Sequence, residues 1–220
     1  MSPPACAPSW RKAGKSSMAW HGSTNVAVYP KPTMVDTAAV KASLRQRLRG
    51  QRVADPAAAT RAAAHFWRQP EAATLRLLLA FAPLPDELDP TPLVAEARRR
   101  GVAVAYPRCE FDGLRLYRVD DETALATGRY GLQEPDPDRA LPVDPSDVDV
   151  ALVPALAVDS RGYRLGRGGG HYDRLLAHPH WRAWRVGFVP AARVRTELPV
   201  DPWDVPLDAF LTEEGLWRLR

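Results

Sequence analysis

The stretch RLGRGGGHYDR, residues 164–174, concentrates groups that bind phosphate. Four of the chain's 14 glycines fall within positions 166–170, although a glycine costs roughly 0.5–1 kcal/mol relative to alanine in regular structure. Glycines let successive backbone N–H groups turn toward one centre, and Arg164 and Arg167 add fixed positive charge with bidentate geometry. The pattern matches neither a Walker A loop nor GxGxxG well. It therefore predicts either a phosphate cradle or a flexible turn.

Three side chains at the end of this loop have types that suit chemistry. Asp173 beside a phosphate pocket requires a cation, usually Mg²⁺, unless it is only a first-turn helix acid. Tyr172 either steadies a transferring phosphate through its hydroxyl or is a packed aromatic. His171 either moves a proton or makes a structural hydrogen bond. Asp159, which precedes the loop, is a further candidate: its carboxylate would either bind the metal ion directly or support a residue that does.

A second set of cations lies toward the N-terminus. Apolar residues recur every four positions over 40–48, which predicts a helix beginning near Asp36. A neighbouring stripe of that helix carries Lys41, Arg45, Arg49 and Arg52. This stripe is either a solvated face or an anion clamp.

The elements that must position these residues alternate between strands and helices. Asp55-Pro56 and Thr91-Pro92 predict helix starts, since a capping residue followed by proline is typical of them. Apolar or alternating runs predict strands at 75–82, 102–106, 114–119, 148–154 and 185–189, with AFLT and LWRLR closing the chain. This order predicts a single three-layer α/β/α domain around a mostly parallel sheet.

In such folds ligands gather beyond the carboxyl ends of the strands. Three segments with chemically capable side chains come just after predicted strands: Pro83–Asp89, Pro107-Arg108 and Asp159–Asp173. The sequence therefore predicts one shared site.

The composition narrows the class of protein. Residues 1–33 hold four basic residues and no acidic one, so the rest of the chain has 26 of each and is formally neutral. A neutral domain argues against nucleic-acid binding, and the lack of an apolar run of about 18 residues argues against a membrane span. Two cysteines cannot form a disulfide scaffold. We expect a disordered extension over 1–35, with a transit segment or a start at Met34 as alternatives, and one domain over 36–220.

Residues 153–176, VPALAVDSRGYRLGRGGGHYDRLL, resemble the signature of the 5-formyltetrahydrofolate cyclo-ligases, also called methenyltetrahydrofolate synthetases. That signature is close to P-G-L-A-F-D-x-x-G-x-R-L-G-x-G-x-G-Y-Y-D-R. Ala155, Val158 and His171 depart from it, and His171 replaces a frequent tyrosine. Further similar stretches, in the family's order, are KASLR (41–45), DELD (86–89), YPR (106–108), YGLQEP (130–135) and DPWDVPLDAFLT (201–212). The resemblance covers about residues 36–213.

The resemblance implies roles for individual residues. ATP would be bound by Lys41, Arg45, Arg164, Leu165, Gly166, Arg167, Gly168, Gly169, Gly170, His171 and Tyr172. The folate substrate would be bound by Ala82, Glu87, Tyr130, Arg167, Gly168, Gly169, Gly170 and His171. Asp173 would hold Mg²⁺, and Arg167 and Tyr172 would act in catalysis.

The implied reaction is the ATP- and Mg²⁺-dependent cyclisation of 5-formyltetrahydrofolate to 5,10-methenyltetrahydrofolate, through a phosphorylated formyl oxygen. The protein would align the substrates and neutralise the γ-phosphate. A cytoplasmic monomer with no nucleic-acid or membrane partner is expected. Two alternatives are a paralogue that keeps the fold and the nucleotide loop without the folate reaction, and a non-catalytic binding or RNA-associated module driven by the basic extension.

Overall fold

The computed structural model describes residues 36–219 except 54 and 129–130, so the predicted extension over 1–35 lies outside the described residues. Within this range the α-helices are α1 (Thr37–Leu48), α2 (Ala58–Phe66), α3 (Thr91–Arg99) and α4 (His171–Leu176). The strands of the main sheet are β1 (Leu77–Leu79), β2 (Ala103–Cys109), β3 (Leu114–Arg118), β6 (Leu141–Val143), β7 (Val150–Pro154), β10 (Trp184–Phe188), β12 (Ala209–Thr212) and β13 (Gly215–Arg218).

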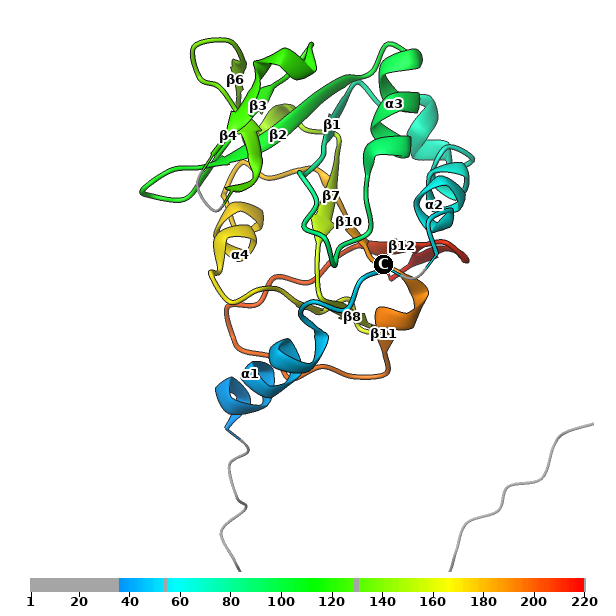
Figure 1. The fold of residues 1–220 in the computed structure, drawn as a ribbon, viewed down its shortest axis with the longest axis vertical. Coiled ribbons are helices and arrows are strands. Elements are labelled where there is room, and N and C mark those ends of the chain that lie inside the picture. The colour runs from blue at the N-terminus through cyan, green and yellow to red at the C-terminus, as the bar shows by residue number, and fades with distance from the viewer. Residues whose placement is uncertain (1–35, 54, 129–130, 220) are drawn as a thin grey trace, which may run out of the picture. The chain divides into compact units, whose positions relative to one another are not determined.

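The main sheet has eight strands in the order β13-β12-β10-β7-β1-β2-β3-β6 (Figure 1). The five strands from β12 to β2 are parallel, and β13, β3 and β6 add antiparallel edges. Because β1 pairs with β2 on one side and with β7 on the other, the strand order reverses beside β1. The carboxyl end of a sheet at such a switch point is where ligands bind in these folds.

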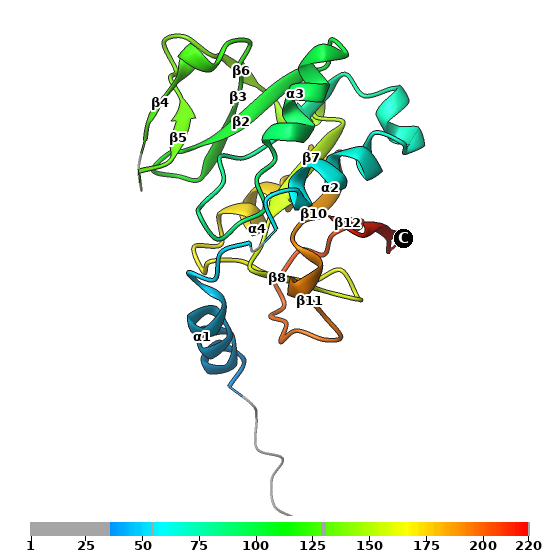
Figure 2. The same ribbon diagram turned by 45° about the vertical axis from the view of Figure 1, so that its right-hand side comes forward.

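Helices cover both faces of the sheet, which confirms the predicted three-layer α/β/α class. On one face, α2 and α3 bury side chains such as Phe66 and Leu93 against Leu78, Leu152 and Phe188. On the other face, α4 and the chain after it pack residues including Leu175 and Trp181 against the sheet. Figures 1 and 2 show α4 on the side opposite α2 and α3, with α1 apart from all three. Full burial of one such aliphatic or aromatic side chain contributes about 1.5–3 kcal/mol.

The predicted helix starts are correct to within two residues, but their capping differs. Asp36 caps α1 as its carboxylate accepts from the N–H groups of Ala38 and Ala39. The Asp55 carboxylate accepts from the Ala57 N–H, one residue before α2, and Asp89, not Thr91, supplies the acceptor at the start of α3. In α2 and α3 the aspartate accepts from the N–H group two residues after it. The position of the proline therefore predicts where each helix begins, but not which residue accepts the hydrogen bond there.

Two small sheets that the sequence patterns do not predict flank the main one. Strands β4 (Leu125–Thr127) and β5 (Gln133–Pro135) form a hairpin. Strands β11 (Val194–Arg195), β8 (Ala157–Asp159) and β9 (Arg164–Leu165) form the other sheet, which leads the chain into the glycine loop. Their shortness explains the miss, because two or three residues show no periodicity.

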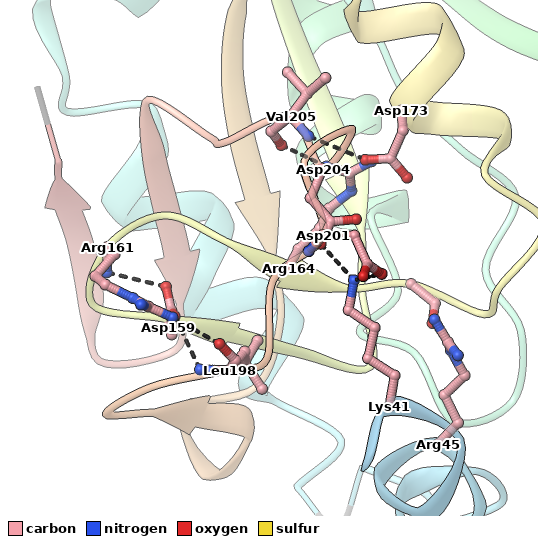
Figure 3. Close-up of polar contacts among 11 residues, drawn as sticks. Lys41, Arg45, Asp159, Arg161, Arg164, Asp173, Leu198, Asp201, Asp204 and Val205 are labelled. Carbon is pink, nitrogen blue, oxygen red and sulfur yellow. Dashed lines mark hydrogen bonds and ion pairs between the residues drawn. The ribbon is translucent and has the colours of Figure 1, made fainter. Parts of the chain in front are cut away.

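Asp159, a candidate ligand by sequence, instead organises the turn between β8 and β9. Its carboxylate is fully buried and accepts five hydrogen bonds, from the backbone and guanidinium of Arg161 and from the N–H groups of Tyr163 and Leu198. Figure 3 shows this cluster well away from Asp173 and Lys41. The carboxylate therefore has no acceptor capacity left for a metal ion.

We predict that Asp159→Asn destabilises the fold by about 2–3 kcal/mol, because an amide cannot accept all five bonds and leaves buried donors unpaired. Urea unfolding at neutral pH measures the change. Asp147→Asn is the matched control, since Asp147 is exposed and accepts no side-chain hydrogen bond from the described residues, and surface changes stay within roughly 0.5 kcal/mol. Equal stability of the two variants would contradict this role.

Candidate functional site

A cavity of about 600 Å³ opens beyond the carboxyl ends of β1, β2 and β7, where the strand order predicts a ligand site. Residues from all three predicted segments line it: Leu84 and Glu87 after β1, Pro107 on β2, and the loop before α4. Helix α1 closes one side with Lys41, Arg45 and Arg49. Residues of the three predicted segments thus line one cavity.

The glycine loop, residues 166–170, is held open by hydrogen bonds to its backbone carbonyls. Arg45 Nε donates to the Gly166 carbonyl at 2.9 Å, and Arg49 Nη2 donates to the Arg167 carbonyl at 2.5 Å. Gly168 and Gly170 have φ of 102° and 64°, a region that favours glycine. Since its carbonyls are engaged by α1, the loop is fixed against the cationic stripe rather than free like a linker.

Arg167 reaches across the cavity to the acidic loop after β1. Its guanidinium pairs with Asp86, and its Nε lies 3.1 Å from Glu87 Oε1. Burial favours the neutral form of Asp86, but the Gly50 N–H and the Arg167 guanidinium outweigh it and keep the pKa of this carboxyl below its usual value. The second oxygen of Glu87 accepts from the Leu84 N–H at 3.0 Å. Both acids of this loop therefore position Arg167 over the cavity.

Arg164 and Asp173 stand at the two ends of the glycine loop and bind each other. Arg164 Nη2 lies 2.8 Å from Asp173 Oδ1, and Arg164 Nη1 donates to the Val205 carbonyl at 2.8 Å. The Val205 N–H donates to the same Asp173 oxygen at 3.3 Å (Figure 3). The Arg164 side chain is only 3% exposed, and its positive charge is balanced by Asp173 within the protein. Asp173 Oδ2 accepts no hydrogen bond from the described residues.

Lys41 is also engaged, at the side of the cavity next to the loop 201–205. Its ammonium lies 2.7 Å from Asp201 Oδ2 and pairs with Asp204. The Lys41 side chain is 5% exposed, and Asp204 additionally accepts from the Asp201 N–H. Figure 3 shows Lys41 rising from α1 toward these two carboxylates. This ammonium therefore fixes the 201–204 turn against α1.

Tyr172 combines a place in the cavity wall with an enclosed hydroxyl group. It lines the wall, and its hydroxyl is buried without a hydrogen-bond partner among the residues described. Burial raises the pKa of this hydroxyl well above its usual value, the negative charge of Glu87 adds to the rise, and Arg164 offsets part of it. The hydroxyl therefore stays protonated at physiological pH.

Comparisons with known proteins identify the family of the chain. Residues 36–213 match the sequence model of the 5-formyltetrahydrofolate cyclo-ligase family. The chain belongs to this family. It is 31% identical to the 5-formyltetrahydrofolate cyclo-ligase of Escherichia coli K12 over 161 residues, which is 71% of this chain and 88% of that one. With the Mycolicibacterium smegmatis cyclo-ligase it shares 34% identity over 66% of this chain and 78% of that one.

A solved structure has the same architecture. The 5,10-methenyltetrahydrofolate synthetase of Aquifex aeolicus matches with a TM-score of 0.71 and 33% sequence identity, over 82% of this chain and 93% of that one. Membership of the cyclo-ligase family confirms the resemblance found in the sequence and the expected enzyme class, a ligase. Among the residues described, no helix is long and apolar enough to cross a membrane.

The structure brings together most of the residues that the resemblance to the cyclo-ligases assigns to a site. Leu165 is the exception among the described ones, since its side chain is buried in a small core beside α1 and does not line the cavity. Tyr130 lies outside the described residues. The side chains that do line the cavity are Lys41, Arg45, Ala82, Glu87, Arg164, Arg167, His171, Tyr172 and Asp173, along with Gly166, Gly168, Gly169 and Gly170.

Sequence reasoning missed several lining residues. Asp201, Trp203 and Asp204 belong to DPWDVPL, a stretch that supported the family resemblance without receiving a role. Two aspartates three positions apart just before a strand are a signal that could have identified them. Glu134 likewise belongs to YGLQEP, where a lone acid in a short strand gives no signal of its own.

We predict that Tyr172→Phe leaves the phenolate absorbance change between pH 9 and about 11 unaltered, because the raised pKa keeps this hydroxyl protonated while the native fold persists. Spectrophotometric titration of the native protein measures it. Tyr163→Phe serves as the comparison. Loss of one tyrosine's amplitude in Tyr172→Phe would show that Tyr172 ionises normally.

Proposed function

We propose that this enzyme uses ATP to cyclise 5-formyltetrahydrofolate to 5,10-methenyltetrahydrofolate, releasing ADP and phosphate. The observation that carries the proposal is the single cavity in which the glycine loop, the α1 cations and the Glu87–Arg167 pair meet. A formamide oxygen is a poor leaving group, so ring closure requires its activation. The names of the relatives from Escherichia coli and Aquifex aeolicus support the same reaction.

The ATP phosphates are proposed to lie against the glycine loop, between α1 and α4. Backbone N–H groups of residues 166–170 face them, and Arg45 and Arg167 add charge. At Gly169 an added Cβ would lie 2.7 Å from the His171 ring, so a side chain there would displace this ring. Lys41 and Arg164 support this site through their carboxylate partners, as their own charges are already paired.

A magnesium ion fits this cavity. Its wall carries five cations and five carboxylates, so the protein alone does not neutralise a triphosphate. The described residues contain no group of three or more metal-ligating side chains, which is usual for Mg²⁺ held by one or two carboxylates and the phosphates of its nucleotide. Asp173 and Asp204 each have one oxygen without a partner among the described residues and would hold it. When bound, the ion neutralises phosphate charge.

The reaction then depends on alignment by the protein's own groups. The formyl oxygen attacks the γ-phosphorus and ADP leaves; N10 next attacks the formyl carbon and loses its proton as the carbon–oxygen bond to phosphate breaks. Arg167, fixed by Asp86 and Glu87, stabilises the charge on the transferring phosphoryl group. The Tyr172 hydroxyl, kept neutral by burial, donates a hydrogen bond to it. Glu87 and Ala82 contact the folate beside the reacting atoms.

The other finer expectations are part of this proposal. We take the enzyme to be a cytoplasmic monomer. We also take it to have no nucleic-acid partner, because positive charge is concentrated in residues 1–33 and the remaining chain is neutral. Gel filtration at micromolar concentration tests the oligomeric state.

We predict that the protein, mixed with 5-formyltetrahydrofolate, ATP and Mg²⁺, forms a product with the near-ultraviolet absorbance of the methenyl compound. Asp173→Asn is expected to lower kcat at least 100-fold at limiting Mg²⁺, since one ligand charge is lost. Asp147→Asn should leave the rate unchanged. No product above a control without ATP would refute the proposed reaction, and a fully active Asp173→Asn would refute the metal role.

A second prediction concerns the clamp on α1. Arg45→Ala should raise the KM for ATP about tenfold while changing the KM for the folate less than twofold, because the Arg45 guanidinium holds the glycine loop and faces the phosphates. Arg47→Ala is the matched control on the same helix, since Arg47 is exposed and does not line the cavity. Equal effects on the two KM values would place Arg45 outside the nucleotide site.

A further inference from the structure

The cavity has two chemically different ends. Toward α1 it is lined by cations and by the glycine loop. Toward β2, β3 and β5 it is lined by apolar residues, among them Pro107, Leu114 and Leu132. Figures 1 and 2 show α1 and the β2–β5 region at opposite ends of the structure, with α4 between them.

One buried acid interrupts the apolar end. Glu134, the central residue of β5, is 5% exposed and lines the cavity. In the part of the chain that the structure describes, its carboxylate takes part in no hydrogen bond or ion pair. Glu87, by contrast, has both oxygens engaged, one by Arg167 and one by the Leu84 N–H. Burying a carboxylate without partners is unfavourable unless a ligand supplies donors.

The β4–β5 hairpin is shaped around this carboxylate. Gly128, at the hairpin turn, lies so close that an added Cβ would be 2.2 Å from Glu134 Oε2. The Gly128 N–H donates to the carbonyl of Leu132, two residues before Glu134, and this hydrogen bond closes the hairpin. Because glycine has no side chain, there is room at this position for the buried carboxylate of Glu134.

The chemistry of the site identifies the group that it would bind. A carboxylate accepts two parallel hydrogen bonds from a planar edge with adjacent N–H donors, as it does from a guanidinium. The 2-amino-4-oxo edge of a pteridine ring has this pattern in its N3–H and 2-amino groups. Apolar walls such as Pro107 and Leu114 suit the faces of such a ring.

We propose that the Glu134 carboxylate binds the N3–H and 2-amino edge of the folate's pteridine ring and thereby sets the orientation of the substrate in the cavity. This inference rests on the proposed function. It places the pteridine at the apolar end, with N5 and its formyl group directed toward Tyr172, Arg167 and the nucleotide. Glu87 then lies beside the reacting atoms and positions Arg167.

The first test is kinetic. Glu134→Gln should raise the KM for 5-formyltetrahydrofolate about 10- to 100-fold, the usual effect of losing charge-assisted hydrogen bonds, and leave the KM for ATP within twofold. Gly128→Ala should act in the same direction, because it displaces the carboxylate without removing it. Glu214→Gln, in the exposed turn between β12 and β13, is the control.

The second test uses binding without turnover. Calorimetry compares 2-amino-4-oxopteridine with 2,4-dioxopteridine, which has an oxygen in place of the amino group. The wild type should prefer the amino compound at least tenfold, Glu134→Gln should reduce this preference below twofold, and Glu134→Asp should restore part of it. Thermal melting confirms that each variant is folded.

The outcomes separate this inference from the function on which it rests. An active wild type whose Glu134→Gln variant keeps both its KM and its preference overturns the role of Glu134 alone. A wild type that forms no methenyl product overturns the proposed function. If Glu134→Gln does not fold, the Gly128→Ala and Glu134→Asp variants decide, and unchanged values in both overturn the role of Glu134.

Discussion

Arg164 and Asp173 stand at the two ends of the glycine loop, and the ion pair between them sets how far apart those ends can be. Both groups also bind the backbone of Val205, so the same interaction holds the C-terminal loop beside the cavity. Arg164 is buried, and removing one partner of such a pair leaves an uncompensated charge, which costs about 3–5 kcal/mol. Glycine-rich backbone has little rigidity of its own. The shape of the cradle therefore depends on this pair.

A second long-range ion pair attaches the first helix. Lys41 on α1 binds Asp201 and Asp204, some 160 positions later in the chain. Apart from this contact, α1 packs through Leu44 and Leu48 against a small core that is separate from the two faces of the main sheet. Since Arg45 and Arg49 reach the glycine loop from the same helix, the position of the loop depends on how firmly Lys41 holds α1.

Much of the fold follows from local patterns, while the roles of the charged residues do not. Continuous apolar runs predict β7 and β10 because strands covered on both faces need apolar side chains on both sides. Lys41 and Arg164, however, are predicted as phosphate ligands, and the structure shows both paired with carboxylates. Their partners are brought near by the path of the chain, which no local pattern encodes. Glu134 was missed for the same reason, since its importance lies in lacking a partner.

These pairings change how the cavity can distinguish its two substrates. Lys41 and Arg164 add little net charge because both are bound to carboxylates, so in the proposed function a divalent cation would help to attract the triphosphate to the end near α1. The carboxylate of Glu134, which has no partner among the described residues, repels phosphate at the other end, where apolar walls also disfavour it. In the proposed function, the nucleotide and the pteridine are therefore each excluded from the other's end. The formyl oxygen and the γ-phosphate meet between them, beside Tyr172 and Arg167.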